Sequence, residues 1–257
     1  MYLDRNGYKI YYETEGTGYP TILLHGLGGN VDHIKALNLN IENIQIITLD
    51  MQGHGKSGIS KDCSFESIAQ DVMELTKHLK ITTFNIGGIS MGALIATYIA
   101  IRYPRLVNKL ILLRSAWCLD YIEQKHINSY SILTDALKNR NIDYYKNSNE
   151  FKVFLNESPG LALSSLGVFL DEASLKYPEK YKYFIKQKAP YNKKDLESIN
   201  SETLILCCDN DSLHTIDISK RLSSFIKKSH LYQITSPYID RNKYNKEVND
   251  LLKDFLS

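Results

Sequence analysis

The stretch Gly88-Ile89-Ser90-Met91-Gly92 constrains the fold more than any other part of this sequence, because it fits the pattern G-x-S-x-G in a telling context. The apolar run 84–87 precedes it, and a second apolar run, 93–100, follows it. This order predicts a buried strand, a sharp turn and a buried helix. The two glycines remove Cβ atoms that would clash in such a turn. The Ser90 hydroxyl is therefore expected to project beyond the edge of a sheet.

Ser90 in such a turn is a candidate nucleophile. The N–H of the following residue, Met91, is expected to point to the place where an oxyanion would form. A second glycine-rich turn, His25-Gly26-Leu27-Gly28-Gly29, follows the apolar run 21–24. Its Leu27 N–H is the candidate second donor of an oxyanion hole, and we expect His25 to brace this loop.

Composition and charge exclude several classes of protein. The 257 residues are 43% hydrophobic and 23% charged, which is ordinary for a globular α/β domain. A net charge of +2 gives no electrostatic case for a nucleic-acid partner. No apolar run approaches the length of about 18 residues that a transmembrane helix needs, so no membrane partner is expected. The four cysteines lack metal-ligand spacing. We expect reduced thiols, a cytoplasmic location, no metal and no cofactor.

Strand and helix signals alternate through most of the chain, which predicts an α/β fold. Apolar runs predict strands over 8–13, 21–24, 44–49, 84–87, 109–113, 203–208 and 231–234, and helical spacing is found over 64–80 and 246–256. Residues 117–201 differ, because they show helical periodicity and no clear strand. We therefore expect a core made of residues 1–116 and 202–257 and a helical lid at 117–201. A small-molecule substrate or ligand is expected under that lid, because parallel sheets bind ligands at this edge.

A third motif joins the first two. Asp50-x-x-Gly53-His54-Gly55-x-Ser57 follows the predicted strand 44–49 and does not satisfy the phosphate-binding pattern G-x-x-x-x-G-K-[ST]. The three motifs, in this order and spacing, resemble the α/β-hydrolase fold family, and most closely its small cytosolic esterase, lactonase and C–C-bond hydrolase branch. The resemblance covers nearly the whole chain apart from the lid. It implies a mostly parallel eight-stranded sheet, helices on both faces, a lid after the sixth strand, and a triad in the order Ser, Asp, His.

The resemblance also assigns the acid of the triad. The family carries it in a turn after the seventh strand, typically as G-x-x-D. The matching run here is Cys208-Asp209-Asn210-Asp211, which makes Asp211 the candidate acid and leaves Asp209 as its competitor.

The base does not follow the family's pattern. The family's histidine comes after the eighth strand, and alignment of the final helix puts Tyr238 at that position. No histidine occurs after His230. A phenol with a pKa of about 10 is protonated at neutral pH and accepts a serine proton poorly. His214, three residues past Asp211, and His126 in the lid are the candidate substitutes.

Two functions remain open at this point. One is a serine-dependent hydrolase of a small carboxylic ester or thioester, weakened by the missing histidine. The other is a non-catalytic binding or regulatory protein that keeps the pocket of a hydrolase. A further departure is Arg114, at the end of the predicted strand 109–113. It is expected to pair either with an acidic group of the substrate or with an internal carboxylate such as Asp120.

Overall fold

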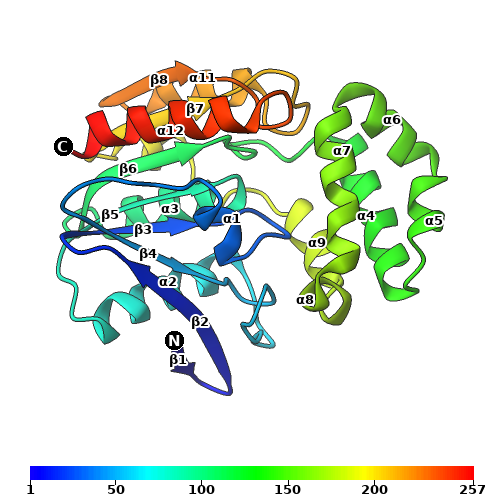
Figure 1. The fold of residues 1–257 in the computed structure, drawn as a ribbon, viewed down its shortest axis with the longest axis horizontal. Helices are drawn as coiled ribbons and strands as arrows, with labels where there is room; N and C mark the ends of the chain where they lie inside the picture. The colour runs from blue at the N-terminus through cyan, green and yellow to red at the C-terminus, as the bar shows by residue number, and fades with distance from the viewer.

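The computed structural model describes residues 1–257, and an eight-stranded sheet runs through its centre (Figure 1). The strand order is β1-β2-β4-β3-β5-β6-β7-β8. Strands β3 to β8 run parallel to their neighbours, whereas β1 pairs antiparallel with β2, and β2 antiparallel with β4. The strands are β1 Tyr2–Arg5, β2 Tyr8–Glu15, β3 Tyr19–Leu24, β4 Ile44–Leu49, β5 Phe84–Ile89, β6 Val107–Leu113, β7 Glu202–Cys207 and β8 Ser229–Gln233. The family's eight-stranded, mostly parallel sheet is thus confirmed.

The central strands are apolar along their length because helices cover both of their faces. Nearly all of β5 and the last four residues of β6 are buried. The register also places the two glycine-rich turns next to each other. Leu24, the last residue of β3, is paired with Gly88 near the end of β5. The turns that follow these two strands therefore meet at the same edge of the sheet.

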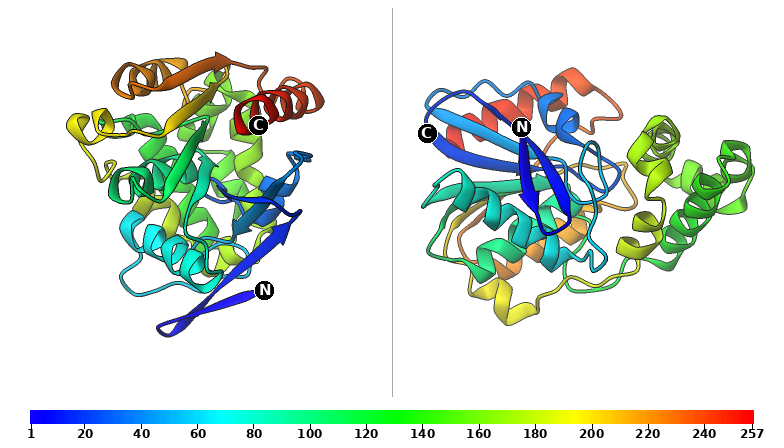
Figure 2. Two further views of the ribbon diagram at one scale, coloured as in Figure 1. Left: turned by 90° about the vertical axis from the view of Figure 1, so that its left-hand side faces the viewer. Right: turned by 90° about the horizontal axis from the view of Figure 1, so that it is seen from below.

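Helices lie on the two faces of the sheet (Figures 1 and 2). On one face, α1 Val31–Lys35 and α12 Arg241–Leu256 pack against strand residues in a core that includes Leu23, Ile111 and Leu204. The other face carries α2 Phe65–His78, α3 Met91–Arg102 and α11 Ile216–Phe225. The final helix begins at Arg241, five residues before the predicted start at 246, because the Asp240 side chain caps it. None of the helices combines the length with the apolar composition that a membrane span requires.

The chain between β6 and β7 forms helices and no strand, as its periodicity predicts. These are α4 Gln124–Lys138, α5 Ile142–Lys146, α6 Asn149–Glu157, α7 Pro159–Leu166, the 3-10 helix η1 Gly167–Leu170, α8 Glu172–Lys176, α9 Glu179–Ile185 and α10 Lys193–Glu197. Most of them form a separate helical layer beyond the carboxyl ends of the strands (Figures 1 and 2). We call residues 117–201 the helical segment. Its last helix, α10, packs against α3 and α11 of the core.

Candidate active site

Ser90 occupies the sharp turn between β5 and α3. Its backbone is in the left-handed region, with a φ of 56°, which is strained for a residue with a side chain. The neighbouring glycines make this turn possible. A Cβ on Gly92 would lie 2.3 Å from the Leu24 carbonyl oxygen, and one on Gly88 would lie 2.5 Å from the backbone of Gly92. The turn thus has the tight geometry that the G-x-S-x-G pattern predicts.

Two backbone amides next to Ser90 have no partner within the chain. Neither the Leu27 nor the Met91 N–H donates a hydrogen bond to another residue. The Leu27 loop is held by His25, whose Nδ1 is 2.8 Å from the Gly26 carbonyl oxygen and whose Nε2 is 3.0 Å from the Met51 amide nitrogen. Burial lowers the pKa of His25 to about 3, so the ring is neutral and supports the loop by hydrogen bonding.

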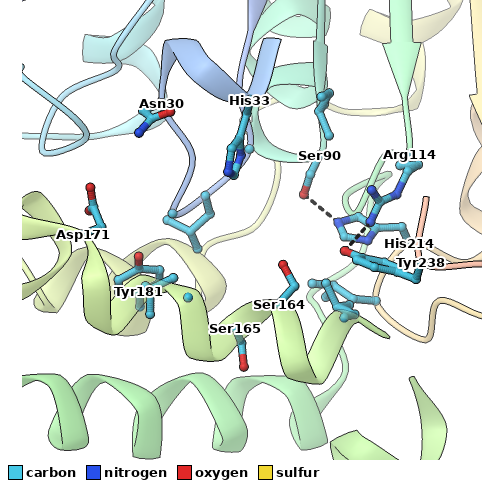
Figure 3. Close-up of a pocket in the computed structure, with 18 of the residues that line it drawn as sticks. Asn30, His33, Ser90, Arg114, Ser164, Ser165, Asp171, Tyr181, His214 and Tyr238 are labelled. Atoms are coloured by element: carbon cyan, nitrogen blue, oxygen red, sulfur yellow. Dashed lines mark hydrogen bonds between the residues drawn. The ribbon is translucent and has the colours of Figure 1, made fainter. Parts of the chain in front are cut away.

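The structure places an imidazole against Ser90, and it belongs to His214. His214 Nε2 lies 2.8 Å from Ser90 Oγ, and His214 Nδ1 lies 2.8 Å from Asp211 Oδ2 (Figure 3). All three residues are buried, with exposed fractions of 8% or less. His214, one of the two candidate substitutes for the family's histidine, is therefore the imidazole within hydrogen-bond distance of Ser90. The loop after β7 supplies both side chains.

Local hydrogen bonds explain how two residues three positions apart in sequence come together. Asp211 Oδ1 accepts the N–H groups of Leu213 and His214, at 3.2 and 3.0 Å. The carboxylate therefore folds the loop back over itself and brings the His214 ring onto Oδ2. An Asp followed by a His three residues later, in a loop after a buried strand, is the sequence signal for this arrangement.

The other site residues predicted from the sequence have different surroundings. Asp209 is exposed. His126 is buried on α4, where its Nε2 lies 3.0 Å from the Ser212 carbonyl oxygen, and it makes no hydrogen bond to Ser90. Tyr238 lies beside the site but binds Arg114 through its hydroxyl. Of the two candidate substitutes, only His214 reaches Ser90.

Arg114 pairs with an internal carboxylate, which is one of the two partners predicted for it; the other was an acidic group of the substrate. The partner is Asp211, not Asp120, which binds Arg221 on the surface. Arg114 Nη2 lies 2.8 Å from Asp211 Oδ2 and 2.9 Å from the Tyr238 hydroxyl oxygen. Burial alone would raise the pKa of Asp211, but the adjacent His214 and Arg114 outweigh it and hold that pKa well below its usual value. Asp211 is therefore ionised at any working pH.

A cavity of about 740 Å³ opens above Ser90, and core and helical segment both line it. Ser90, His214, Arg114 and Tyr238 lie at one end of it, and Asp171 lies at the other (Figure 3). Its lining from the helical segment is mainly apolar and aromatic and includes Trp117, Tyr130, Leu133, Leu161, Val168 and Ile185. The volume is in the range of small-molecule sites.

The helical segment touches both glycine-rich loops of the core. Tyr181 on α9 packs so closely against the oxyanion loop that a Cβ on Gly28 would lie 2.8 Å from its hydroxyl oxygen. The preceding residue, Lys180, is 3% exposed and donates to the Gly53 carbonyl oxygen at 2.7 Å. Burial lowers the pKa of Lys180 to about 7, and the charge of Asp171 offsets this only in part.

The helical segment also holds the loop that carries Asp211 and His214. The Ser212 amide donates to Ser158 Oγ at 2.7 Å, and that hydroxyl donates to Ser212 Oγ at 3.0 Å. His126 bonds the Ser212 carbonyl oxygen. The amide, the hydroxyl and the carbonyl group of Ser212 thus all bind side chains of the helical segment. Ser212 lies in the chain between Asp211 and His214.

Comparison with known proteins agrees with this fold. A family model described as the alpha/beta hydrolase fold matches residues 19–238. A putative carbamate hydrolase of Agrobacterium fabrum is 36% identical over 105 residues, which are 38% of this chain and 39% of that protein. A proline iminopeptidase of Pestalotiopsis fici is 27% identical over 98% of this chain and 95% of its own length. The first two curated relatives are matched over only 39% and 52% of their lengths.

Solved structures share the fold over nearly the full chain. The enol-lactonase from Burkholderia xenovorans has a TM-score of 0.77 at 18% identity, covering 100% of this chain and 99% of its own. An esterase from Exiguobacterium antarcticum has a TM-score of 0.75 at 21% identity, covering 96% of each chain. At these identities the likeness concerns the fold.

Proposed function

The chain belongs to the alpha/beta-hydrolase fold family, and on this premise we propose that it is a serine-dependent hydrolase of small carboxylic esters or thioesters. The curated relatives named above are hydrolases, which supports a general hydrolase function. One observation carries the proposal: Ser90, His214 and Asp211 form a continuous chain of hydrogen bonds, each 2.8 Å long. Such a chain links nucleophile, base and acid in serine hydrolases.

In the first step, Ser90 Oγ attacks the carbonyl carbon of the ester while His214 Nε2 takes the hydroxyl proton. Asp211 accepts Nδ1–H of His214, so the tautomer with a free electron pair on Nε2 faces Ser90. The carbonyl oxygen gains the negative charge and is stabilised by the Leu27 and Met91 N–H groups, which have no other partner.

In the second step, the tetrahedral intermediate collapses. The bond to the leaving alcohol or thiol breaks, and His214 returns the proton to that group, which leaves an acyl group on Ser90. Water then attacks the acyl group while His214 takes one of its protons. The bond between the acyl group and Ser90 Oγ breaks, and His214 gives the proton to Oγ, which releases the acid and restores Ser90. Asp211 stabilises the imidazolium formed in each step, and it stays ionised because Arg114 is its second partner.

The helical segment serves as the lid of this site in our proposal. It contributes the apolar wall of the cavity, and it contacts the loops that carry the oxyanion donors and the acid–base pair. A cavity of about 740 Å³ suits a small acyl or alkyl group better than a polymer.

The alternative, a binding protein without catalysis, rests on the absence of a base. The 2.8 Å contact between His214 and Ser90 favours the hydrolase over this alternative.

A fluorophosphonate probe tests the proposal, because it reacts with serines that a neighbouring base activates. We expect labelling of the wild type and no labelling of Ser90→Ala. Ser164→Ala is the matched control, because Ser164 lines the same cavity and makes no contact with His214. It is expected to be labelled like the wild type and to hydrolyse 4-nitrophenyl butyrate. A wild type that remains unlabelled at every pH up to about 9 would contradict the proposal.

A further inference from the structure

Arg114 keeps hydrogen-bond donors that no group in the chain accepts. Its Nη2 binds Asp211 and Tyr238, whereas Nε is buried without a partner and Nη1 makes no hydrogen bond within the chain. Since Nη1 is unpaired but not fully buried, it is the nitrogen that reaches the cavity. The residue has a φ of 48°, a strained conformation at the end of β6 that persists only where its surroundings hold it.

The Tyr238 hydroxyl is a second unused donor at the same place. Its oxygen accepts a hydrogen bond from Arg114, which leaves its own hydrogen without an acceptor in the chain. Burial raises the pKa of Tyr238, so the phenol stays protonated at neutral pH. The helical segment packs tightly against Tyr238. Gly160 is so close to it that a Cβ added to this glycine would lie 2.2 Å from the Tyr238 Cβ.

No carboxylate at this end of the cavity is free to accept from these donors, and an unpaired oxygen beside Arg114 belongs to the neutral hydroxyl of Tyr244. The one nearby carboxylate, Asp211, is engaged on both oxygens by His214, Leu213 and Arg114. The other carboxylate of the lining, Asp171, lies at the far end and accepts two hydrogen bonds from Ser174 (Figure 3).

Arg241 adds a second positive charge to the lining of the cavity. Arg241 lines the cavity at the start of α12, over the ring of Tyr244, and has no carboxylate within ion-pair distance. The wall beside Ser90 therefore offers a guanidinium N–H, a phenol O–H and a free cation, with no carboxylate left open to pair with them. A planar anion is the group that such a set of donors fits.

We propose that Arg114 and Tyr238 form a carboxylate subsite beside Ser90, so that the preferred substrates are half-esters of short dicarboxylic acids. The inference rests on the proposed hydrolase function and adds the class of substrate. The substrate carboxylate accepts hydrogen bonds from Arg114 Nη1 and the Tyr238 hydroxyl, and the ester carbonyl at the other end of the acyl chain lies against Ser90. Tyr238 thus stands where the family carries its base, but it serves recognition.

The test compares each half-ester with its methyl ester, which lacks the negative charge. The kcat/KM values are measured for 4-nitrophenyl half-esters of glutarate and adipate and for the same compounds with the carboxylate methylated. Hydrolysis in the presence of Ser90→Ala gives the background. We expect a preference for the free carboxylate of about 10- to 100-fold, because hydrogen bonds to a charged group discriminate by that much. Tyr238→Phe, which removes one donor, is expected to reduce the preference about tenfold.

Tyr181→Phe is the matched control, because it removes a phenol hydroxyl at the far end of the same cavity, where that hydroxyl binds Ser174. It is expected to leave the ratio between the two esters unchanged. Hydrolysis of both esters at similar rates, or a ratio insensitive to Tyr238→Phe, overturns the subsite and leaves the hydrolase function intact.

Binding without turnover gives an independent measurement. Calorimetry with adipate on Ser90→Ala is expected to show an affinity that falls about tenfold when Tyr238→Phe is added. Equal affinities overturn the subsite, whether or not the wild type hydrolyses esters. Failure of both esters to react with the wild type, while adipate still binds, counts against the hydrolase function alone.

Discussion

Replacing His214 by Gln removes the base and tests the assignment of the site most directly. Gln fills a similar volume and cannot take the Ser90 proton. Loss of a triad base lowers turnover by roughly 10⁴- to 10⁶-fold. At about 1.4 kcal/mol for each factor of ten, this corresponds to a barrier raised by about 5–8 kcal/mol. The effect should fall on kcat, since His214 acts on the proton rather than on the binding of the substrate.

The same substitution should leave the fold intact. His214 contributes two side-chain hydrogen bonds, to Ser90 and Asp211, and Arg114 still neutralises the buried carboxylate after the change. A loss of about 1–3 kcal/mol is expected. For a domain of this size it lowers Tm by up to about 10 °C, which differential scanning calorimetry measures.

His126→Gln is the matched control, because His126 is also a buried histidine and touches the same loop. It loses a single hydrogen bond to Ser212, so kcat should fall no more than about tenfold. The assay is steady-state hydrolysis of 4-nitrophenyl butyrate at 25 °C, with fluorophosphonate labelling in parallel. A His214→Gln variant that keeps a tenth of the wild-type kcat would refute the assignment of His214 as the base. A fall of about 10⁴-fold or more in His126→Gln would refute it as well.

Two further predictions concern the contacts of the helical segment with the core. Lys180 has a folded pKa of about 7 and an ordinary value near 10.5, so the unfolded chain holds more protons between these values and stability rises with pH across this window. Urea unfolding should show a gain of about 3 kcal/mol from pH 7 to 9.5 that Lys180→Met lacks, and an equal gain in the variant would rule this out. Ser158→Ala leaves the Ser212 amide without an acceptor, at a cost of about 1–3 kcal/mol in stability, and should lower kcat because the loop that carries Asp211 and His214 loses a contact that holds it. Ser158→Thr keeps the hydroxyl and should retain most of the activity, so a similar loss in both variants would contradict this role.

The fold could be predicted because its apolar runs and glycine-rich turns each depend on a few residues that are neighbours in the sequence. The apolar runs of β3 to β7 need burial on both faces, and the glycines around Ser90 are explained by contacts with the neighbouring backbone. The antiparallel strand β1 was not predicted, because it is four residues long and half of its side chains are exposed. Its place depends on pairing with β2, which is a tertiary contact.

The candidate site could be predicted only in part. The positions of Ser90 and Asp211 follow from motifs, but the choice between His214 and His126 depends on the path of a loop. That path is set by the Asp211 carboxylate and by a left-handed Asn210, neither of which leaves a periodic pattern. Sequence spacing thus places a residue on a loop, whereas the hydrogen bonds of that loop decide which atom it reaches.

The acid and the base of this site are separated by only two residues of one loop, and that has a mechanical consequence. Where the base follows the eighth strand, two independent loops must keep their alignment for proton transfer. Here Asp211 and His214 are coupled within one turn, because Asp211 Oδ1 accepts the His214 backbone N–H and Oδ2 lies 2.8 Å from the His214 ring. The distance from His214 Nε2 to Ser90 Oγ is then the one that links this loop to the turn after β5. The chain after β8 carries neither the acid nor the base, and it is linked to this pair through the Tyr238 hydroxyl, which binds Arg114.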